Sequence, residues 1–132
     1  LAAVRAAGLP AFVALDANER VLGFCWARPF RPLAAYSATV EDSIHVASDV
    51  RRHGVARALL EALITACGER GCRQMIAVVG DARNLASIRL HESLGFKAVG
   101  YLPAAGHKPG GPVDVVLLQR SLAPEHWRKA SM

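Results

Sequence analysis

The feature that most constrains the fold is an amphipathic segment, Val55–Glu69, near the middle of the chain. Its apolar residues recur at helical spacing and share one face: Val55, Ala56, Leu59, Leu60, Leu63, Ile64 and Cys67. Polar residues occupy the opposite face, and Gly68 and Gly71 are expected to end the helix. The segment Gln74–Val79 follows and is apolar throughout, which favours a strand that is buried on both faces and parallel to a neighbour. A helix followed by such a strand indicates a fold that combines a sheet with helices.

The other predicted elements place strands before and after this pair. Apolar or β-branched runs predict further strands at Ala11–Leu15, Val21–Ala27, Ala38–Val46, Lys97–Leu102 and Val113–Arg120. A second helix is predicted over Leu85–Leu94, with Asn84 as its N-cap and Gly95 just after its end. The stretch Pro103–Pro112, which contains proline and glycine, is predicted to be a loop. The resulting order, β-β-β-α-β-α-β-β, is typical of an α/β or α+β domain with two helices.

Composition supports one folded domain over residues 1–132, with a short polar tail at 123–132. The chain is 52% apolar and 20% charged, which excludes a disordered protein. The apolar runs are too short to cross a bilayer, and no charged-then-apolar leader opens the sequence, so we expect a cytoplasmic protein without a membrane partner. The three cysteines have no metal-ligand spacing, so we expect buried thiols and no metal site. Since the first residue is Leu1, we expect a chain that is processed or shortened at its front end.

The basic residues favour a local anionic ligand over an extended nucleic-acid surface. The formal net charge is +5, which suits a nucleotide cofactor or nucleic acid. Three arginines cluster at one loop, and aromatic residues, which stack on bases, make up only 6% of the chain. A single phosphate site therefore agrees better with the sequence, and we expect no nucleic-acid partner.

That loop, residues 46–57, joins a predicted strand to the long predicted helix. Gly54 and Ala56 allow the backbone to approach an anion, and the free N–H groups of the helix start can bind phosphate oxygens. Arg51, Arg52 and Arg57 add positive charge at the same place. The spacing does not match a P-loop, which ends in Gly-Lys-Ser/Thr, or a dinucleotide fingerprint, which needs three glycines. An ordinary strand-to-helix turn with solvated arginines is the alternative.

This loop and three other segments resemble a known enzyme family. The pattern Arg-x-x-Gly-x-Ala at Arg51–Ala56 resembles the loop with which the GNAT superfamily of N-acetyltransferases binds the pyrophosphate of acetyl-CoA. The segments Val40–Val46, Asn84–Phe96 and Ala104–Val115 are similar, in order and spacing, to the phosphinothricin and methionine-sulfone N-acetyltransferase subgroup. The resemblance covers residues 11–122 and implies a mixed, mostly antiparallel central sheet flanked by helices. Family members begin with a further strand and one or two helices, and we expect these to be missing here.

The resemblance implies acetyl-CoA as co-substrate, and it implies a set of contacts. The expected cofactor-binding residues are Ile44, His45, Val46, Arg51, Arg52, His53, Gly54, Val55, Ala56, Arg57, Asn84 and Ser87. The main chain of residues 44–46 is expected to pair with the pantetheine arm like an added strand, and one of its amides to polarise the thioester oxygen. Asn84 is expected to bond the same arm, to act only as an N-cap, or to do both.

Acetyl transfer to an amine needs a base, because a substrate ammonium must first lose its proton. Glu41 stands inside a predicted strand, where an acidic side chain is disfavoured unless it is used. A glutamate at the matching place is the base of the family, so Glu41 is the expected catalytic base, with an ion pair or an exposed carboxylate as the alternative. In a regular strand Asp42 points to the opposite face from Glu41, so it is a weaker candidate for the base. His91 stands where many superfamily members have a tyrosine general acid, so it is expected either to act in catalysis on the thiolate side or to be a buried, hydrogen-bonded histidine.

His107 and Lys108 lie in the predicted glycine-rich loop, which the resemblance places beside the acceptor site. There Lys108 would meet a substrate carboxylate, and a solvated loop is the alternative.

The leading hypothesis is an acetyl-CoA-dependent N-acetyltransferase in which a small amino-acid-like amine attacks the thioester directly. The expected acceptor is of the phosphinothricin or methionine sulfone and sulfoximine type. The alternatives are an enzyme for another amine, such as a polyamine, an aminoglycoside or a protein N-terminus, and a CoA-binding sensor without catalysis. A homodimer is the oligomeric state that we consider beside a monomer.

Overall fold

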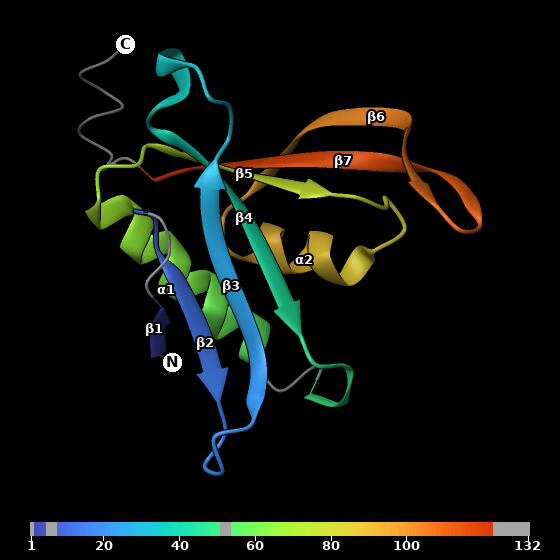
Figure 1. The fold of residues 1–132 in the computed structure, drawn as a ribbon. Helices are drawn as coiled ribbons and strands as arrows, with labels where there is room; N and C mark the ends of the chain where they lie inside the picture. The colour runs from blue at the N-terminus through green and yellow to red at the C-terminus, as the bar shows by residue number, and fades with distance from the viewer. Residues whose placement is uncertain (1, 5–7, 51–53, 123–132) are drawn as a thin grey trace.

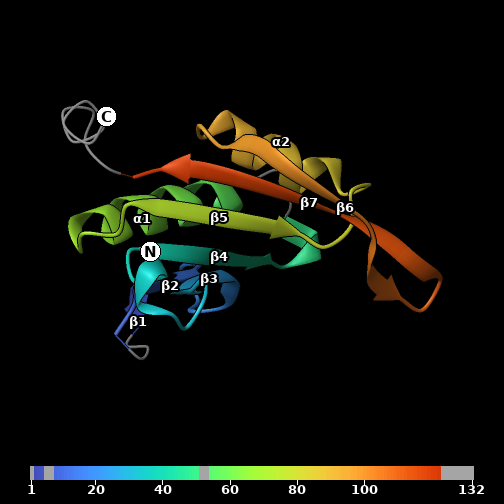
Figure 2. The same cartoon turned by 90° about the horizontal axis from the view of Figure 1, so that it is seen from above.

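The computed structural model describes residues 2–4, 8–50 and 54–122, and its centre is a seven-stranded sheet. The strands lie in the order β1-β2-β3-β4-β5-β7-β6 (Figures 1 and 2). Their bounds are β1 (Ala2–Val4), β2 (Ala11–Leu15), β3 (Val21–Pro29), β4 (Thr39–Val46), β5 (Gln74–Val79), β6 (Lys97–Lys108) and β7 (Gly111–Ser121). Neighbouring strands are antiparallel except β4 and β5, which run parallel as predicted. The sheet is therefore mixed and mostly antiparallel.

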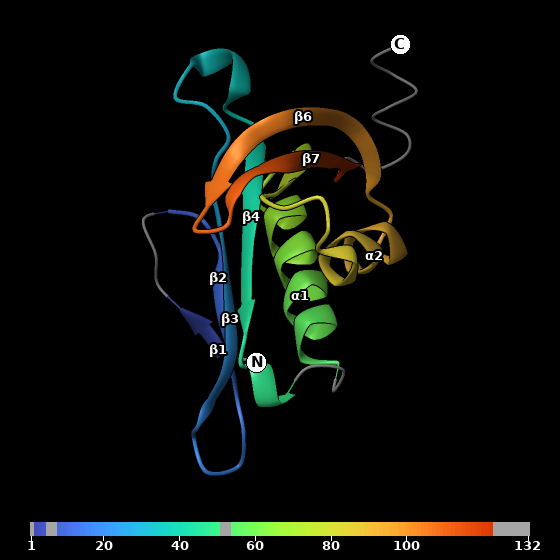
Figure 3. The ribbon, with the colours of Figure 1, turned by 90° about the vertical axis from the view of Figure 1, so that its right-hand side faces the viewer.

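In the described part of the chain, two α-helices lie on the same side of β2, β3 and β4 (Figure 3). The first, α1 (Val55–Glu69), has the predicted bounds and packs on β2, β3 and β4, while α2 (Leu85–Ser93) packs on β5 and β6. Gly95 follows α2 with φ 91°, a left-handed conformation that favours glycine, whereas Gly68 lies inside α1 instead of ending it. Short 3₁₀ helices occupy two connections, η1 (Ala34–Tyr36) and η2 (Ser48–Val50). Neither α-helix has the length and apolar character that are needed to cross a membrane.

The core lies between α1 and the sheet, and the predicted apolar face of the helix forms one side of it. Four residues of that face are 0% exposed: Leu59, Leu60, Leu63 and Cys67. They belong to one cluster with almost fully buried strand residues: Cys25, Val40, Met75 and Leu118. Removal of these apolar side chains from water is the main stabilising contribution to such a fold.

All three cysteines are buried free thiols, as predicted. Burial raises the pKa of Cys25 to about 11 and that of Cys67 to about 12. Both thiols therefore stay protonated at neutral pH and pack as small apolar groups.

The prediction of a loop over Pro103–Pro112 is wrong. Strands β6 and β7 occupy most of this stretch and form a long hairpin that extends away from the rest of the sheet (Figure 1). Proline and glycine are typical of loops, but an irregularity in the pairing before Gly106 accommodates them here. Within it Ala104 has φ 54°, and its N–H donates to the Asp114 carboxylate at 2.8 Å. Gly106 itself is required, because a Cβ there would lie 2.8 Å from Val113 Cγ2.

The short strand β1 precedes Ala11, where the sequence analysis predicted no strand. It pairs with β2 in antiparallel register. Three residues are too few for an alternation of polar and apolar side chains to mark a strand, so the pattern could not predict it.

Candidate active site

The parallel strands β4 and β5 pair for only part of their length. Their register runs from Thr39 opposite Gln74 to Glu41 opposite Ile76, and beyond that point the two strands separate (Figure 1). The later part of β4 pairs with β3 on its other side, and β5 pairs with β7. The two edges that face each other therefore have no strand partner within the described chain. Main-chain N–H and C=O groups along such edges can bind an extended ligand as an added strand.

A cavity of about 230 Å³ lies where β4 and β5 separate. Six of the predicted site residues line it: Glu41, Ile44, His45, Asn84, Ser87 and His91. They come from β4 and from the start and one side of α2, while residues 77–80 of β5 and its continuation complete the wall. Arg28, Asp42 and Ser43 also line the cavity, although the sequence analysis did not assign them to the site. The fold thus brings two segments together that are about 40 positions apart in the sequence.

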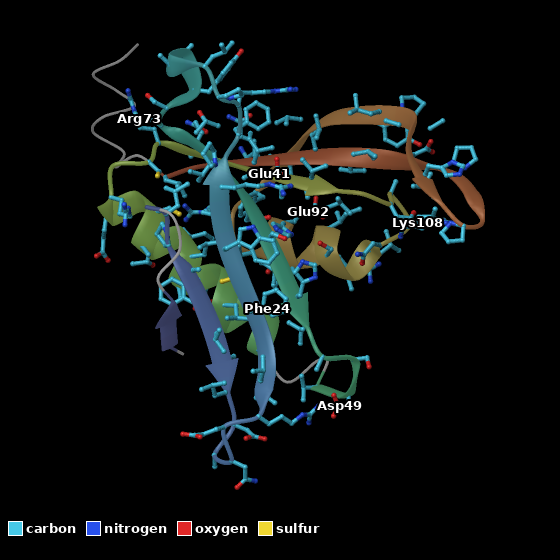
Figure 4. All side chains as sticks on the ribbon, in the orientation of Figure 1. Phe24, Glu41, Asp49, Arg73, Glu92 and Lys108 are labelled. Carbon is cyan, nitrogen blue, oxygen red and sulfur yellow. The ribbon has the colours of Figure 1, made fainter. Side chains whose placement is uncertain are left out.

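Glu41 is the last residue of β4 that pairs with β5, and it lies in the wall of the cavity (Figure 4). Its side chain is 14% exposed and forms an ion pair with Arg28, which stands opposite it on β3. Because Arg28 is 55% exposed, water screens this ion pair, and its contribution to stability is small. The carboxylate is thus partly covered and faces the cavity, where it can accept a proton from a cationic group. The pairing of Arg28 with Glu41 could be predicted only from the register of β3 against β4.

Asp42 and His91 form a buried ion pair between β4 and α2. His91 Nε2 lies 2.8 Å from Asp42 Oδ2, and the two side chains are 6% and 5% exposed, respectively. The other ring nitrogen, Nδ1, lies 2.8 Å from the carbonyl oxygen of Ser87. Both neighbours of the ring are hydrogen-bond acceptors, so this geometry favours an imidazolium that donates to each of them. The ring also packs edge-on against Phe96, with 4.9 Å between the ring centroids.

Burial lowers the pKa of His91, but the hydrogen bond and charge of Asp42, together with the Ser87 carbonyl, outweigh burial and raise this pKa above its ordinary value. The pair therefore stabilises the fold fully below pH ~6.5, the ordinary histidine pKa in an unfolded chain. This contribution is lost as the pH rises through the raised pKa of the folded state. A buried, hydrogen-bonded histidine is one of the two alternatives that the sequence predicts at this position. The sequence alone could not pair His91 with Asp42, because the two residues are 49 positions apart.

Asn84 is the N-cap of α2, as predicted, and it also lines the cavity. Its side-chain Oδ1 accepts a hydrogen bond from the N–H of Ser87 at 3.2 Å. The cap satisfies one of the N–H groups that a helix start leaves without a partner inside the helix. It also fixes the first turn of α2, the turn that carries Ser87 toward the cavity.

We expect the substitution Asn84→Ala to lower the free energy of unfolding by about 1 kcal/mol, because alanine cannot cap the helix. Asn84→Asp should retain most of this stability, since its carboxylate oxygen can accept the same hydrogen bond. Urea unfolding of the three proteins measures the difference. Equal stability of the Ala and Asp variants would show that the cap has no role in stabilising α2.

The predicted phosphate loop is described only in part. Gly54 precedes α1 with φ 77°, and a Cβ at this position would meet nothing within 4 Å, so the backbone here is open to a ligand. No side chain in the described residues caps the start of α1. Arg57 is engaged, because its Nε lies 2.9 Å from Glu61 and its Nη1 donates to Ser93 Oγ at 3.1 Å. Three further predicted contacts lie outside the described residues: Arg51, Arg52 and His53.

The structure does not bring the other predicted site residues into the wall of the cavity. Among the described residues these are Val46, Gly54, Val55, Ala56, Arg57, His107 and Lys108. Lys108 lies at the end of β6, far along the hairpin from Glu41 (Figure 4), and its Nζ is 3.3 Å from Asp81 Oδ2. The hydrogen bonds from Arg83 and from Lys108 hold the pKa of Asp81 well below its ordinary value. Asp81 is therefore a carboxylate that offsets the charge of Lys108.

Fold and site together define a class of protein, a mixed α/β domain in which two parallel strands separate around a ligand cavity. Residues 3–96 match the acetyltransferase (GNAT) family, and this match covers more than half of the chain. The protein therefore belongs to the acetyltransferase (GNAT) family. The resemblance inferred from the sequence is confirmed, as is the mixed, mostly antiparallel sheet that it implied.

The chain is also similar to individual N-acetyltransferases, both in sequence and in structure. A phosphinothricin N-acetyltransferase of Alcaligenes faecalis is 45% identical over 88% of this chain and 58% of its own length. An L-methionine sulfoximine/L-methionine sulfone acetyltransferase of Pseudomonas paraeruginosa is 38% identical over 89% of this chain and 67% of its own length. A crystal structure of a GNAT superfamily phosphinothricin acetyltransferase from Sinorhizobium meliloti in complex with AcCoA has a TM-score of 0.83 and 42% identity, over 88% of this chain and 62% of that one. The chain thus spans about three fifths of the length of the Alcaligenes and Sinorhizobium proteins.

Proposed function

We propose that this protein is an acetyl-CoA-dependent N-acetyltransferase that acts on the amine of a small amino-acid-like substrate. The observation that carries the proposal is the cavity between the separating ends of β4 and β5, with the Glu41 carboxylate in its wall. The names of the relatives, which mention phosphinothricin, methionine sulfoximine and methionine sulfone, support the acceptor class.

The unpaired edge of β4 is the proposed site of the pantetheine arm. Residues 44–46 would pair with it through main-chain groups, and one N–H of this edge would polarise the thioester carbonyl. The Asn84 cap uses the carboxamide oxygen, which leaves the amide nitrogen to donate to the same arm, with Ser87 beside it in the cavity wall. A relative with the same fold has been crystallised in complex with AcCoA, which supports acetyl-CoA as the ligand.

The start of α1 is the proposed site of the diphosphate. The N–H groups of Val55 and Ala56, which follow Gly54 directly, would bind its oxygens. Positive charge would come from side chains of the same segment: Arg51, Arg52, His53 and Arg57. Arg57 would have to give up part of its present contact with Glu61 to do so.

Glu41 is the proposed base. It takes a proton from the substrate ammonium, directly or through a water molecule, and so generates the neutral amine. The amine nitrogen then bonds to the carbonyl carbon of the thioester, and the carbon–sulfur bond breaks. The attacking nitrogen loses a proton to become the amide nitrogen, and the thiolate takes up one proton to become the free thiol of CoA. The imidazolium of His91, in the wall of the same cavity, supplies positive charge on the thiolate side.

His107 and Lys108 are the proposed contacts of the acceptor, with Lys108 exchanging its bond to Asp81 for the substrate carboxylate. The proposal includes a homodimer, because the edge strand β6 exposes large apolar side chains at Val99, Tyr101 and Leu102. It also includes a cytoplasmic location, which agrees with three free, buried thiols. No membrane or nucleic-acid partner is part of the proposal.

The first test is binding of acetyl-CoA to the protein. At a hundredfold excess of ligand over its Kd, we expect stabilisation by about 2.7 kcal/mol, measured as a shift of the unfolding transition. Free acetate at the same concentration is the control, because it lacks the pantetheine and diphosphate groups. A transition that no acyl-CoA moves would contradict the proposal.

The second test is release of free thiol from acetyl-CoA in the presence of candidate amines. Methionine sulfone, methionine sulfoximine and phosphinothricin should be acetylated, whereas polyamines and aminoglycosides should react more slowly. Binding of acetyl-CoA without turnover of any amine would favour the CoA-binding sensor instead.

A further inference from the structure

Asp42 is a buried carboxylate that the proposed reaction does not use. It is 8% exposed, although carboxylates are rarely buried unless a partner compensates for their lost hydration. Its neighbour Glu41 points to the other face of β4 and pairs with Arg28. Asp42 points toward α2 and pairs with His91. The two adjacent carboxylates thus lie on opposite faces of β4 and have different partners.

The Asp42–His91 pair lies just where pairing between β4 and β5 ends. Glu41 and Ile76 are the last paired residues of the two strands, and Asp42 follows directly. From there β4 pairs with β3 alone, and the ion pair is a side-chain link from β4 to α2 in the wall of the cavity. Because α2 follows β5 in the chain, this link sets the distance between β4 and the unit formed by β5 and α2.

The link also fixes the imidazole ring. One ring nitrogen is bound to Asp42 and the other to the Ser87 carbonyl, while Phe96 packs against the ring. A ring that is held at both nitrogens cannot flip without breaking two buried hydrogen bonds. The side of the ring that faces the cavity is therefore constant.

Charged groups on the elements around α2 are engaged elsewhere or exposed, which leaves Asp42 as the charge partner of His91. In the described chain these groups are Glu41 and His45 on β4, Arg57, Glu61 and Glu69 on α1, Arg89 and Glu92 on α2, Lys97, His107 and Lys108 on β6, and Asp114 and Arg120 on β7. His45 bonds to Ser43, and Arg120 donates to the carbonyl of Leu94 at 2.7 Å. Glu41 pairs with Arg28, Arg57 with Glu61, and Lys108 with Asp81, while Asp114 accepts a hydrogen bond from Tyr101. The remaining residues are exposed: Glu69, Arg89, Glu92, Lys97 and His107.

We propose that Asp42 is a positioning residue, whose carboxylate holds His91 as an imidazolium of fixed orientation and thereby sets the width of the cavity between β4 and α2. This inference rests on the proposed acetyltransferase function, because the cavity that Asp42 shapes is the one in which acetyl transfer would occur. It assigns to Asp42 a role that acts through His91, without contact between Asp42 and the reacting atoms.

The first experiment is an NMR titration of the histidine side chains in the free protein, without acetyl-CoA. The signal of His91 is identified by its absence from His91→Gln. In the wild-type protein we expect it to titrate above the ordinary histidine range and to carry protons on both nitrogens below its pKa. In Asp42→Asn the midpoint should move to lower pH, whereas Glu92→Gln, which removes an exposed carboxylate from the same helix, should leave it unchanged.

The second experiment compares kinetics of the same variants. Asp42→Ala should lower kcat by about a hundredfold, because it releases His91 from its position. A misplacement of about 1 Å in an active site has an effect of this size. Asp42→Asn should recover part of the loss, since its carboxamide oxygen still accepts a hydrogen bond from Nε2. The KM for acetyl-CoA should change much less than kcat, and Glu92→Gln should behave as wild type.

An unchanged titration of His91 in Asp42→Asn would overturn the inference, as would a wild-type kcat in Asp42→Ala. If Asp42→Ala does not fold, the titration and kinetics of Asp42→Asn decide the question. If the wild-type protein acetylates no amine, the proposed function fails, but the titration still shows whether Asp42 holds His91.

Discussion

Replacement of Glu41 by glutamine is expected to lower kcat for amine acetylation by roughly 10²–10⁴-fold, the usual contribution of a general base. Glutamine has nearly the same shape as glutamate and can still bond to Arg28, so the fold should be retained. It cannot accept a proton from the substrate ammonium. The measurement is thiol release at saturating acetyl-CoA and amine, with the stability of each protein checked by urea unfolding.

The control for this substitution is Glu69→Gln, which removes an exposed carboxylate at the end of α1 and should leave kcat unchanged. Acetyl-CoA should stabilise Glu41→Gln as much as the wild-type protein, because none of the proposed cofactor contacts involves the side chain of Glu41. A variant with full turnover would exclude Glu41 as the base. A variant that no longer binds acetyl-CoA would assign Glu41 to cofactor binding instead.

In the two proposals, the adjacent carboxylates of β4 have separate roles. Glu41 faces Arg28 and the cavity, where a proton can be transferred, while Asp42 faces His91 in the protein interior. The alternation of side chains along a strand makes this separation possible, because neighbours point to opposite faces. The parallel pairing with β5 ends at Glu41, so both carboxylates lie where the sheet opens.

Local sequence patterns predicted the elements that carry a periodic signal. The apolar stripe of Val55–Glu69 gave the bounds of α1, and the apolar run Gln74–Val79 gave those of β5. The two strands of the β6–β7 hairpin were predicted, but its outer part, Pro103–Pro112, was predicted to be a loop because proline and glycine are typical of loops. The irregular pairing at Ala104 lets a strand contain them. At this irregularity the N–H of Ala104 donates to the Asp114 carboxylate, a contact across the hairpin that no local pattern encodes.

The candidate site was predictable to the extent that it depends on motifs within single segments. Glu41 was noticed because it is an acidic residue in a strand, and Asn84 because it precedes a helix. Arg28 was not predicted, and Asp42 was placed on the opposite face from Glu41 but was not paired with His91. Each of these contacts is defined by the packing of two separate elements. Strand register and the placement of α2 beside β4 are properties of the whole fold, and only the structure reveals them.

Replacement of Leu63 by alanine is expected to lower the free energy of unfolding by about 2–5 kcal/mol, the usual range for loss of a large buried side chain. Leu63 is 0% exposed and lies in the core between α1 and the sheet, where the shorter side chain would leave a cavity. Thr65→Ala, on the exposed face of the same helix, should change stability by less than about 0.5 kcal/mol. Urea unfolding measures both effects, and the slope against denaturant should stay constant.

The same variant separates stability from catalysis, because Leu63 does not line the cavity. A domain of this size is stable by roughly 5–15 kcal/mol, so Leu63→Ala should still be folded at room temperature when the wild-type value exceeds the loss, and the same urea unfolding measures both. Its kcat should then stay near the wild-type value, whereas Glu41→Gln should lose turnover at full stability. A large loss of kcat in folded Leu63→Ala would mean that packing beneath α1 controls the geometry of the cavity, and that the site cannot be treated as a set of polar contacts on a rigid sheet.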